Sequence, residues 1–247
     1  MFALLITASL VCQTEANSPV PGKQVAQTAT IRLTADDGST RETKLHYLLF
    51  LPVGYSADEA QKWPLLLFLH GSGERGDDLE LVKKHGPPKL VETKPDFPFV
   101  VVSPQCPKET RWNPHELAKL VDSLSNTLRI DKTRRYVTGL SMGGSGSWSL
   151  LAEYPGLFAA AVPICGRGET AAVEKMTKTP LWVFIGAKDK PELVAANESL
   201  VAALKKAGGN VQYTVYPEVG HDSWTQTYDD PRVWQWLLGQ SSAAENK

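Results

Sequence analysis

Cysteine is scarce in this 247-residue sequence, which has three: Cys12, Cys106 and Cys165. Three thiols cannot build the disulfide framework on which many small secreted domains depend. If Cys12 is removed with a leader segment, Cys106 and Cys165 remain as one potential pair. The sequence leaves a disulfide open, but two buried free thiols are the interpretation we favour.

An excess of charge of either sign is also missing. Lys and Arg total 26 and Asp and Glu total 27, for a formal net charge of −1. No basic run with interleaved aromatic residues is present, so the chain as a whole has no attraction for nucleic acid or an anionic membrane. No group of residues has metal-ligand spacing either. We therefore predict no nucleic-acid partner, no metal and no cofactor.

Long hydrophobic runs are lacking as well. The apolar stretch Phe2 to Cys12 is too short to cross a bilayer, so no stable membrane insertion is expected. It is followed by Thr14-Glu15-Ala16, which has the small-x-small form of a signal-peptide cleavage site. No Lys or Arg precedes Lys23, so the signal is atypical. We predict a signal peptide over residues 1–16 and export to the periplasm or medium. The alternative is a cytoplasmic protein with a misassigned start.

The rest of the chain predicts one large domain. Residues 17–28 are polar and contain proline, which indicates a linker, and residues 241–247 form a polar tail. No internal repeat or linker-like break interrupts residues 29–240. The hydrophobic content of 42% is enough to fill a sizeable core.

Apolar runs and helical patterns alternate along this domain. An opening hairpin is expected around Asp36-Asp37-Gly38. Continuous apolar runs, typical of strands buried on both faces, occupy 64–69, 99–102, 159–162 and 181–185, and an alternating strand covers 211–216. Helical patterns cover 114–128, 192–207 and 231–238. The sequence therefore predicts an α/β fold, with a mostly parallel, twisted central sheet and helices on both faces.

The most informative motif is Gly139-Leu140-Ser141-Met142-Gly143, which has the form G-x-S-x-G. A β-type run precedes it and a helical segment follows it, which is the setting of a nucleophile elbow. The turn holds its serine in a strained conformation, and side chains at Gly139 or Gly143 would collide with neighbouring backbone. We predict Ser141 as a nucleophile; the alternative is a plain glycine-rich loop.

A serine hydroxyl needs a base, and the base needs an orienting acid. In this fold type the partners follow the serine in the order acid, then histidine. His221 is the one histidine after Ser141, and it lies beyond a predicted edge strand. Asp189 follows the strand at 181–185 and is the predicted acid. Rival acids that remain open are Glu192, Glu218 and Asp222.

An acyl-transfer site also needs N–H donors for the oxyanion. The backbone N–H of Met142, directly after the nucleophile, is the first candidate. The second should come from the loop His70 to Gly76, where we favour the Ser72 N–H over that of Gly71. His70 is expected to orient this loop by hydrogen bonding and not to act as the base.

Two tryptophans fall on loops near the predicted site. Trp112 and Trp224 have rings that would stack on a sugar or an aryl acyl group, or pack against the sheet edge, and the sequence leaves both roles open. The short interval between the predicted elbow helix and the strand at 181 has little room for a lid. An open cleft that accepts short or soluble acyl esters is therefore expected.

These motifs together carry a family resemblance over roughly residues 40–240. The sequence resembles α/β-hydrolase esterases of the dienelactone hydrolase, polyhydroxybutyrate depolymerase and feruloyl esterase type. The matching segments are 70–73, 139–144, 186–189 and 220–224, together with 104–107 followed by Trp112. Dienelactone hydrolases proper use cysteine, whereas this sequence has Ser141.

The resemblance implies an α/β-hydrolase fold and a cofactor-independent serine carboxylesterase with Ser141, Asp189 and His221 as its triad. The implied substrate is a small-molecule or polysaccharide-linked ester, and an acetyl or feruloyl carbohydrate ester is the sharper version. Alternatives are a peptidase of the prolyl-oligopeptidase type and a non-catalytic binding module with this fold.

Overall fold

The computed structural model describes residues 18–34, 37–56 and 60–243. These residues form an eight-stranded sheet in the order β1-β2-β4-β3-β5-β6-β7-β8. The strands are β1 (Gln24–Thr34), β2 (Thr40–Phe50), β3 (Trp63–Leu69), β4 (Val100–Pro104), β5 (Ile130–Leu140), β6 (Ala160–Ile164), β7 (Leu181–Gly186) and β8 (Val211–Tyr216). Pairings from β4 through β8 are parallel, while β2 is antiparallel to both neighbours. The predicted α/β class is confirmed.

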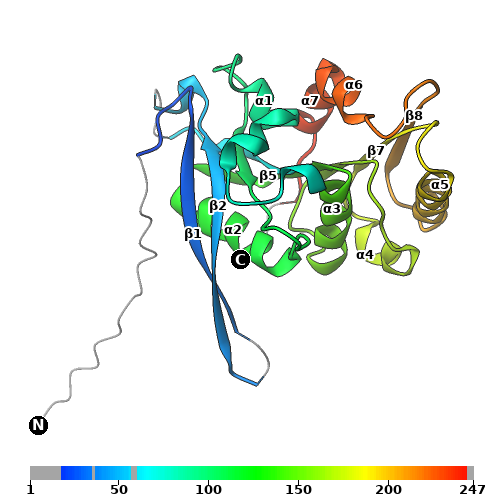
Figure 1. The fold of residues 1–247 in the computed structure, drawn as a ribbon, viewed down its shortest axis with the longest axis horizontal. Coiled ribbons are helices and arrows are strands. Elements are labelled where there is room, and N and C mark those ends of the chain that lie inside the picture. The colour runs from blue at the N-terminus through cyan, green and yellow to red at the C-terminus, as the bar shows by residue number, and fades with distance from the viewer. Residues whose placement is uncertain (1–17, 35–36, 57–59, 244–247) are drawn as a thin grey trace, which may run out of the picture.

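The opening hairpin is longer than predicted. Strand β1 pairs with β2 from Gln24 opposite Phe50 to Thr34 opposite Thr40, and the hairpin extends away from the rest of the fold (Figure 1). Residues 24–28 are therefore strand, and their assignment to a linker was wrong. Polar composition concealed the strand because only alternate side chains, such as Gln27 and Ala29, are buried. The predicted signal peptide, residues 1–16, lies outside the described residues.

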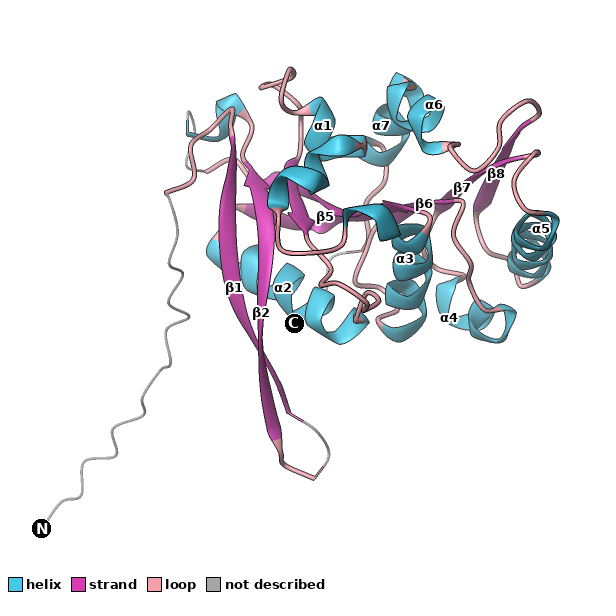
Figure 2. Cartoon of the chain, in the orientation of Figure 1, coloured by secondary structure: helices cyan, strands magenta, loops and turns pink. Residues whose placement is uncertain are grey.

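Helices cover both faces of the sheet (Figure 2). One face carries α2 (Pro114–Thr127), α3 (Met142–Glu153), α4 (Val173–Met176) and α5 (Pro191–Lys206). The other carries α1 (Gly86–Leu90), α6 (Trp224–Asp229) and α7 (Pro231–Leu238). Short 3₁₀ segments are η1 (Val53–Ser56), η2 (Ser72–Glu74), η3 (Leu79–Lys84) and η4 (Thr170–Ala172). Within the described ranges, no helix is both long and apolar enough to span a bilayer.

Strand β3 shows why the central runs are continuously apolar. Leu65, Leu67 and Leu69 belong to the hydrophobic cluster on the α2–α5 face. Leu66 and Phe68 point the other way, into the cluster shared with α6 and α7. Successive side chains of a strand face opposite sides, so a strand covered by helices on both faces needs an apolar residue at every position.

The loops that follow the strands meet at one end of the sheet. Ser141 follows β5, Asp189 follows β7 and His221 follows β8, and all three line one cavity. In parallel sheets this carboxyl end is where ligands bind, because loops from several strands converge there. Strand order thus brings together residues that are 80 positions apart in the chain.

Candidate active site

Ser141 occupies a sharp turn between β5 and α3. Its backbone has φ 53° and ψ −111°, which is the strained conformation predicted for the elbow. A Cβ at Gly143 would lie 1.8 Å from the Leu69 carbonyl oxygen, and one at Gly139 would lie 2.5 Å from the Gly143 oxygen. Only glycine fits at these positions, as expected, and their backbones hold the serine in the lining of the cavity.

His221 and Ser141 are in hydrogen-bond contact. The distance from His221 Nε2 to Ser141 Oγ is 2.8 Å. The histidine loop is held against the acid loop, because Lys188 N–H donates to the Val219 carbonyl at 2.9 Å and a Cβ at Gly186 would lie 2.1 Å from the Gly220 oxygen. This close backbone approach positions the imidazole.

Asp189 completes the chain of contacts. Its Oδ2 lies 2.7 Å from His221 Nδ1, so Nδ1–H donates to the carboxylate and Nε2 is free to accept from Ser141. The other oxygen, Oδ1, accepts the Lys190 N–H at 2.7 Å. The carboxylate is 1% exposed, so its orientation is fixed by these two bonds.

The rival acids have other environments. Glu218 forms an exposed ion pair with Lys188. Asp222 accepts from Thr225 N and Oγ1 at the start of α6. Glu192 is exposed in the first turn of α5. The geometry therefore selects Asp189 among the four candidates.

Met142 and Ser72, the residues predicted to supply the oxyanion N–H donors, both begin a helical segment. Met142 is the first residue of α3, and Ser72 is the first residue of η2. N–H groups in the first turn of a helix have no acceptor within that helix. Both residues line the cavity beside Ser141, whereas Gly71 is buried and does not.

His70 anchors the loop that carries Ser72. Its Nε2 accepts the Cys106 N–H at 3.0 Å, so Nδ1–H donates to the Gly71 carbonyl at 2.6 Å. Burial lowers the pKa of His70 to about 4, because charging the ring would cost desolvation energy. The imidazole is thus neutral, and it orients this loop as predicted.

Packing contacts account for both tryptophans. Trp112 is 8% exposed, donates its indole N–H to the His70 carbonyl at 3.2 Å and stacks edge-on against the His70 ring at 4.7 Å. Trp224 lies edge-on to His221 at 5.5 Å, and neither tryptophan is among the residues that line the cavity of Ser141. Of the two roles left open, these contacts favour packing.

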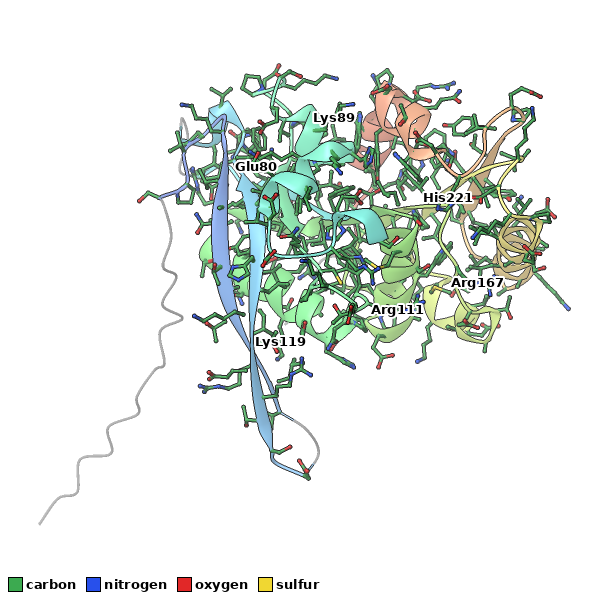
Figure 3. All side chains as sticks on the ribbon, in the orientation of Figure 1. Glu80, Lys89, Arg111, Lys119, Arg167 and His221 are labelled. Atoms are coloured by element: carbon green, nitrogen blue, oxygen red, sulfur yellow. The ribbon has the colours of Figure 1, made fainter. Side chains whose placement is uncertain are left out.

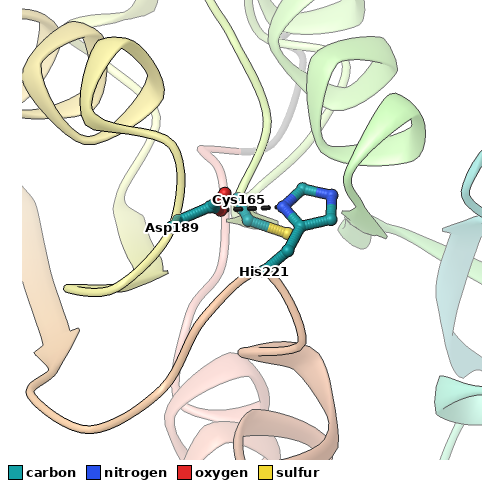
Figure 4. A group of neighbouring side chains, drawn as sticks. All are labelled: Cys165, Asp189 and His221. Atoms are coloured by element: carbon teal, nitrogen blue, oxygen red, sulfur yellow. Dashed lines mark hydrogen bonds and ion pairs between the residues drawn. The ribbon is translucent and has the colours of Figure 1, made fainter.

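Cys165 lies beside the three residues and was not foreseen. It follows β6, and its sulfur lies next to the imidazole (Figure 4), with potential metal-ligand atoms of Cys165, Asp189 and His221 within 4.8 Å of one another. Burial raises the pKa of this thiol to about 12, whereas metal ligation needs a thiolate. His221 Nδ1 and Asp189 already bind each other, so the donor set fits hydrogen bonding better than a metal. Cys106 and Cys165 are buried free thiols, as favoured.

The cavity has a volume of about 730 Å³. Basic side chains dominate its border, and sequence reasoning missed them: Arg75, Arg111, Arg167, Lys188 and Lys190. They lie on four separate loops, so no local pattern marks them. Cys165, in contrast, could have been found from the rule that strand ends converge.

Known proteins share both the sequence pattern and the fold. The Esterase family model, described as "Putative esterase", matches residues 38–247. An endo-1,4-beta-xylanase/feruloyl esterase of Xylanibacter ruminicola is 26% identical over 193 residues, which are 70% of this chain and 26% of that protein. This chain therefore spans about a quarter of that relative's length.

Solved structures extend the comparison. The crystal structure of a thermostable esterase is 32% identical with a TM-score of 0.70, covering 87% of this chain and 63% of that one. A mutant feruloyl esterase module from Clostridium thermocellum, complexed with sinapinate, is 15% identical with a TM-score of 0.62, covering 92% of this chain and 93% of that one. The second likeness concerns the fold alone. The family match, which covers most of the sequence, shows that this chain belongs to the Esterase family, and its fold is that of the α/β-hydrolase serine esterases.

Proposed function

We propose that this esterase is a serine carboxylesterase that hydrolyses short-chain or soluble acyl esters through an acyl-enzyme, with Ser141, His221 and Asp189 as its triad. The observation that carries the proposal is the continuous contact from Ser141 Oγ through the imidazole to Asp189, at 2.8 and 2.7 Å. A half-buried serine in a strained elbow that lines an open cavity has the setting that acyl transfer needs.

Acylation begins when His221 Nε2 takes the Ser141 hydroxyl proton as Oγ attacks the ester carbonyl. The resulting oxyanion accepts hydrogen bonds from the N–H groups of Met142 and Ser72. Asp189 stabilises the imidazolium through its hydrogen bond with Nδ1–H. His221 then returns the proton to the departing alkoxide, which leaves as the alcohol, and the acyl group remains on Ser141.

Deacylation repeats the same chemistry with water. His221 removes a proton from a water molecule, the hydroxide adds to the acyl carbonyl, and the second tetrahedral intermediate uses the same two N–H donors. Collapse breaks the bond to Oγ, and His221 returns the proton to Ser141. The products are one carboxylic acid and one alcohol per water consumed.

An acetyl or feruloyl carbohydrate ester is the sharper version of the substrate. Support comes from the relatives, which include an endo-1,4-beta-xylanase/feruloyl esterase. That relative is about four times longer than the matched segment, so its activity is carried over here only as a proposal. The cavity of about 730 Å³ is large enough for one sugar or aryl group. Export by residues 1–16 would place the enzyme with such substrates.

The test is hydrolysis of p-nitrophenyl esters from acetate to decanoate, with methyl ferulate and acetylated xylan alongside. Ser141→Ala is expected to lower kcat by about a thousandfold or more, since the nucleophile is lost. Ser149→Ala is the matched control, because Ser149 is an exposed serine of the same helix. It should leave kcat unchanged.

Two outcomes would contradict the proposal. The first is a wild-type enzyme that turns over none of these esters; if it cleaved peptide anilides instead, the peptidase alternative would take its place. The second is Ser141→Ala with wild-type activity, which would require another nucleophile.

A further inference from the structure

The border of the active-site cavity is strongly basic although the chain as a whole is nearly neutral. Arg75, Arg111, Arg167, Lys188 and Lys190 line the cavity, against two acids, Glu109 and Asp189. Asp189 is buried behind His221 and hydrogen bonded to it. A net charge of −1 for the whole chain means that the positive charge is concentrated at this site.

Two of these cations are already committed. Arg75 donates to the carbonyl oxygens of Ser72 at 3.0 Å and Thr110 at 3.2 Å, which ties the loop of Ser72 to the loop after β4. Lys188 pairs with Glu218. These contacts stabilise the loops and leave fewer N–H donors of Arg75 and Lys188 for a ligand.

Of the remaining three cations, Lys190 is also exposed and has no ion pair among the described residues, but only Arg111 and Arg167 carry a planar guanidinium. Both side chains are exposed, and neither has an ion pair within the described part of the chain, although Glu109 borders the same cavity. Arg111, Arg167 and His221, all labelled in Figure 3, line the same cavity. Two exposed guanidinium groups that have no carboxylate partner and line the same cavity as the nucleophile are available to an anionic ligand.

The backbones that carry these two arginines are firmly held. Arg167 N–H donates to Ser145 Oγ at 2.8 Å, and the buried Asn197 donates Nδ2–H to the Gly166 carbonyl at 3.0 Å. Thr110, which precedes Arg111, is held in two ways. Its carbonyl accepts from Arg75 at 3.2 Å, and its Oγ1 lies 3.3 Å from Cys106 Sγ. The arginines therefore project from ordered loops with their guanidinium groups free.

We propose that Arg111 and Arg167 bind a carboxylate on the substrate, so that the preferred ester carries a free carboxylate in its acyl or its alcohol part. This inference rests on the esterase function proposed above and specifies its substrate class. A guanidinium matches a carboxylate with two parallel N–H···O bonds, and a cleft lined by one sign of charge concentrates the opposite ion. Hydrogen bonds to charged groups contribute roughly tenfold to a hundredfold in affinity.

The experiment compares matched esters that differ in one charge. For the acyl side, mono-4-nitrophenyl adipate is compared with 4-nitrophenyl hexanoate. For the alcohol side, 4-acetoxybenzoate is compared with its methyl ester. In at least one pair, kcat/KM for the anion should exceed that for the neutral ester by roughly tenfold at low salt. Added sodium chloride should reduce that ratio, because salt screens exposed charges.

The variants are Arg111→Gln/Arg167→Gln and, as a control with the same change of net charge, Arg32→Gln/Arg232→Gln. Arg32 and Arg232 lie on β1 and α7, outside the cavity. The first double variant should lose the preference for the anion while its kcat/KM on the neutral ester stays within about twofold. The control should keep the preference.

Several results would overturn the inference while leaving the esterase function intact. One is a wild-type ratio near one in both pairs. Another is an equal loss on charged and neutral esters in Arg111→Gln/Arg167→Gln, since the arginines would then serve the oxyanion or the fold. Stronger inhibition by inorganic phosphate than by benzoate at equal ionic strength would reject a carboxylate as the bound group.

A binding measurement separates failure of the inference from failure of the proposed function. Calorimetric titration of Ser141→Ala with 4-acetoxybenzoate and, separately, with mono-4-nitrophenyl adipate requires no turnover. Binding of either anion that disappears in Ser141→Ala/Arg111→Gln/Arg167→Gln supports the carboxylate site even if no ester were hydrolysed. Absence of binding of both anions to Ser141→Ala at millimolar concentration counts against it.

Discussion

The floor and the rim of the cavity are built in opposite ways. The floor consists of Ser141, Asp189 and His221, which follow strand ends and are joined by hydrogen bonds of 2.7 and 2.8 Å. The rim includes Arg111 and Arg167, which lie on loops, are exposed and have no ion pair within the described residues. On the floor every functional atom already has a protein partner, whereas the rim keeps charged groups available.

This difference separates two tasks. Acyl transfer needs groups that are already oriented, because reorganisation during the reaction would raise the barrier. Substrate selection needs groups that exchange water for a ligand, and exposed guanidinium groups do so at little cost. The comparison assigns the proposed acyl transfer to residues at the strand ends and the proposed selection of the ester to arginines on the surrounding loops.

The largest effect is expected from replacing Asp189, the acid on the floor of the cavity. Asp189→Asn should lower kcat about 10⁴-fold with little change in KM, because the amide favours the wrong tautomer of His221. Steady-state kinetics on one neutral and one anionic ester measure it, and both should fall equally. Glu218→Gln is the control and should keep wild-type kcat. A full loss in Glu218→Gln with activity retained in Asp189→Asn would reassign the acid.

The next effect is expected from a side chain added at Gly143, where the elbow contacts the backbone of β3. Gly143→Ala would place a Cβ 1.8 Å from the Leu69 oxygen, so β3 and the elbow must separate. We expect a loss of about 3 kcal/mol in the free energy of unfolding, together with loss of activity. Urea denaturation measures the first quantity.

Gly73→Ala is the matched control for that variant. Gly73 lies on the neighbouring loop with no atom within 4 Å of an added Cβ. Its stability should stay within about 1 kcal/mol of wild type. Equal stability of the two variants would show that the elbow tolerates a side chain.

The smallest effect is a pH dependence of stability that comes from His70. Its pKa is about 4 in the folded protein and 6.5 in the reference state, so below pH 6.5 the unfolded chain binds a proton that the folded chain does not. Stability therefore falls between pH 6.5 and 4, by at most about 3 kcal/mol, and this contribution is constant below pH 4.

Chemical denaturation at a series of pH values checks this slope. His70→Asn should be less stable overall, because the bond from Cys106 N–H is lost, but its stability should fall less steeply between pH 6.5 and 4. His46→Gln, a change at an exposed histidine, should keep the wild-type slope. An unchanged slope in His70→Asn would assign the effect to other groups.

Much of the fold followed from local patterns. The continuous apolar run at 64–69 predicted β3 because a strand covered on both faces has no polar position. The glycines around Ser141 predicted the elbow because each contact there is with backbone. Residues 24–28 were missed because half of an exposed hairpin strand faces water, so its composition resembles that of a linker.

The order of the triad residues could also be predicted from the sequence, but the basic side chains around them could not. The position of His221 after a strand and of Asp189 after the preceding strand led to the observed pairing. Trp112 shows why a position on a nearby loop does not identify a substrate contact. It lies on a loop that was predicted to be near the site, but its ring packs beneath the loop of His70. Cys165 follows a strand end and could have been found from that position, whereas the basic rim residues lie on four separate loops and share no motif.

The sequence by itself determined the main elements and the strained serine turn, because these depend on short-range sterics and on local runs of apolar residues, and its motifs carried the resemblance to the esterase family. Tertiary structure alone decided which acid contacts His221, which tryptophan atoms face the core and which arginines share a cavity. Those outcomes depend on strand order and loop paths, which bring residues from distant parts of the chain within a few ångströms. A local sequence pattern does not predict which of these distant residues come into contact.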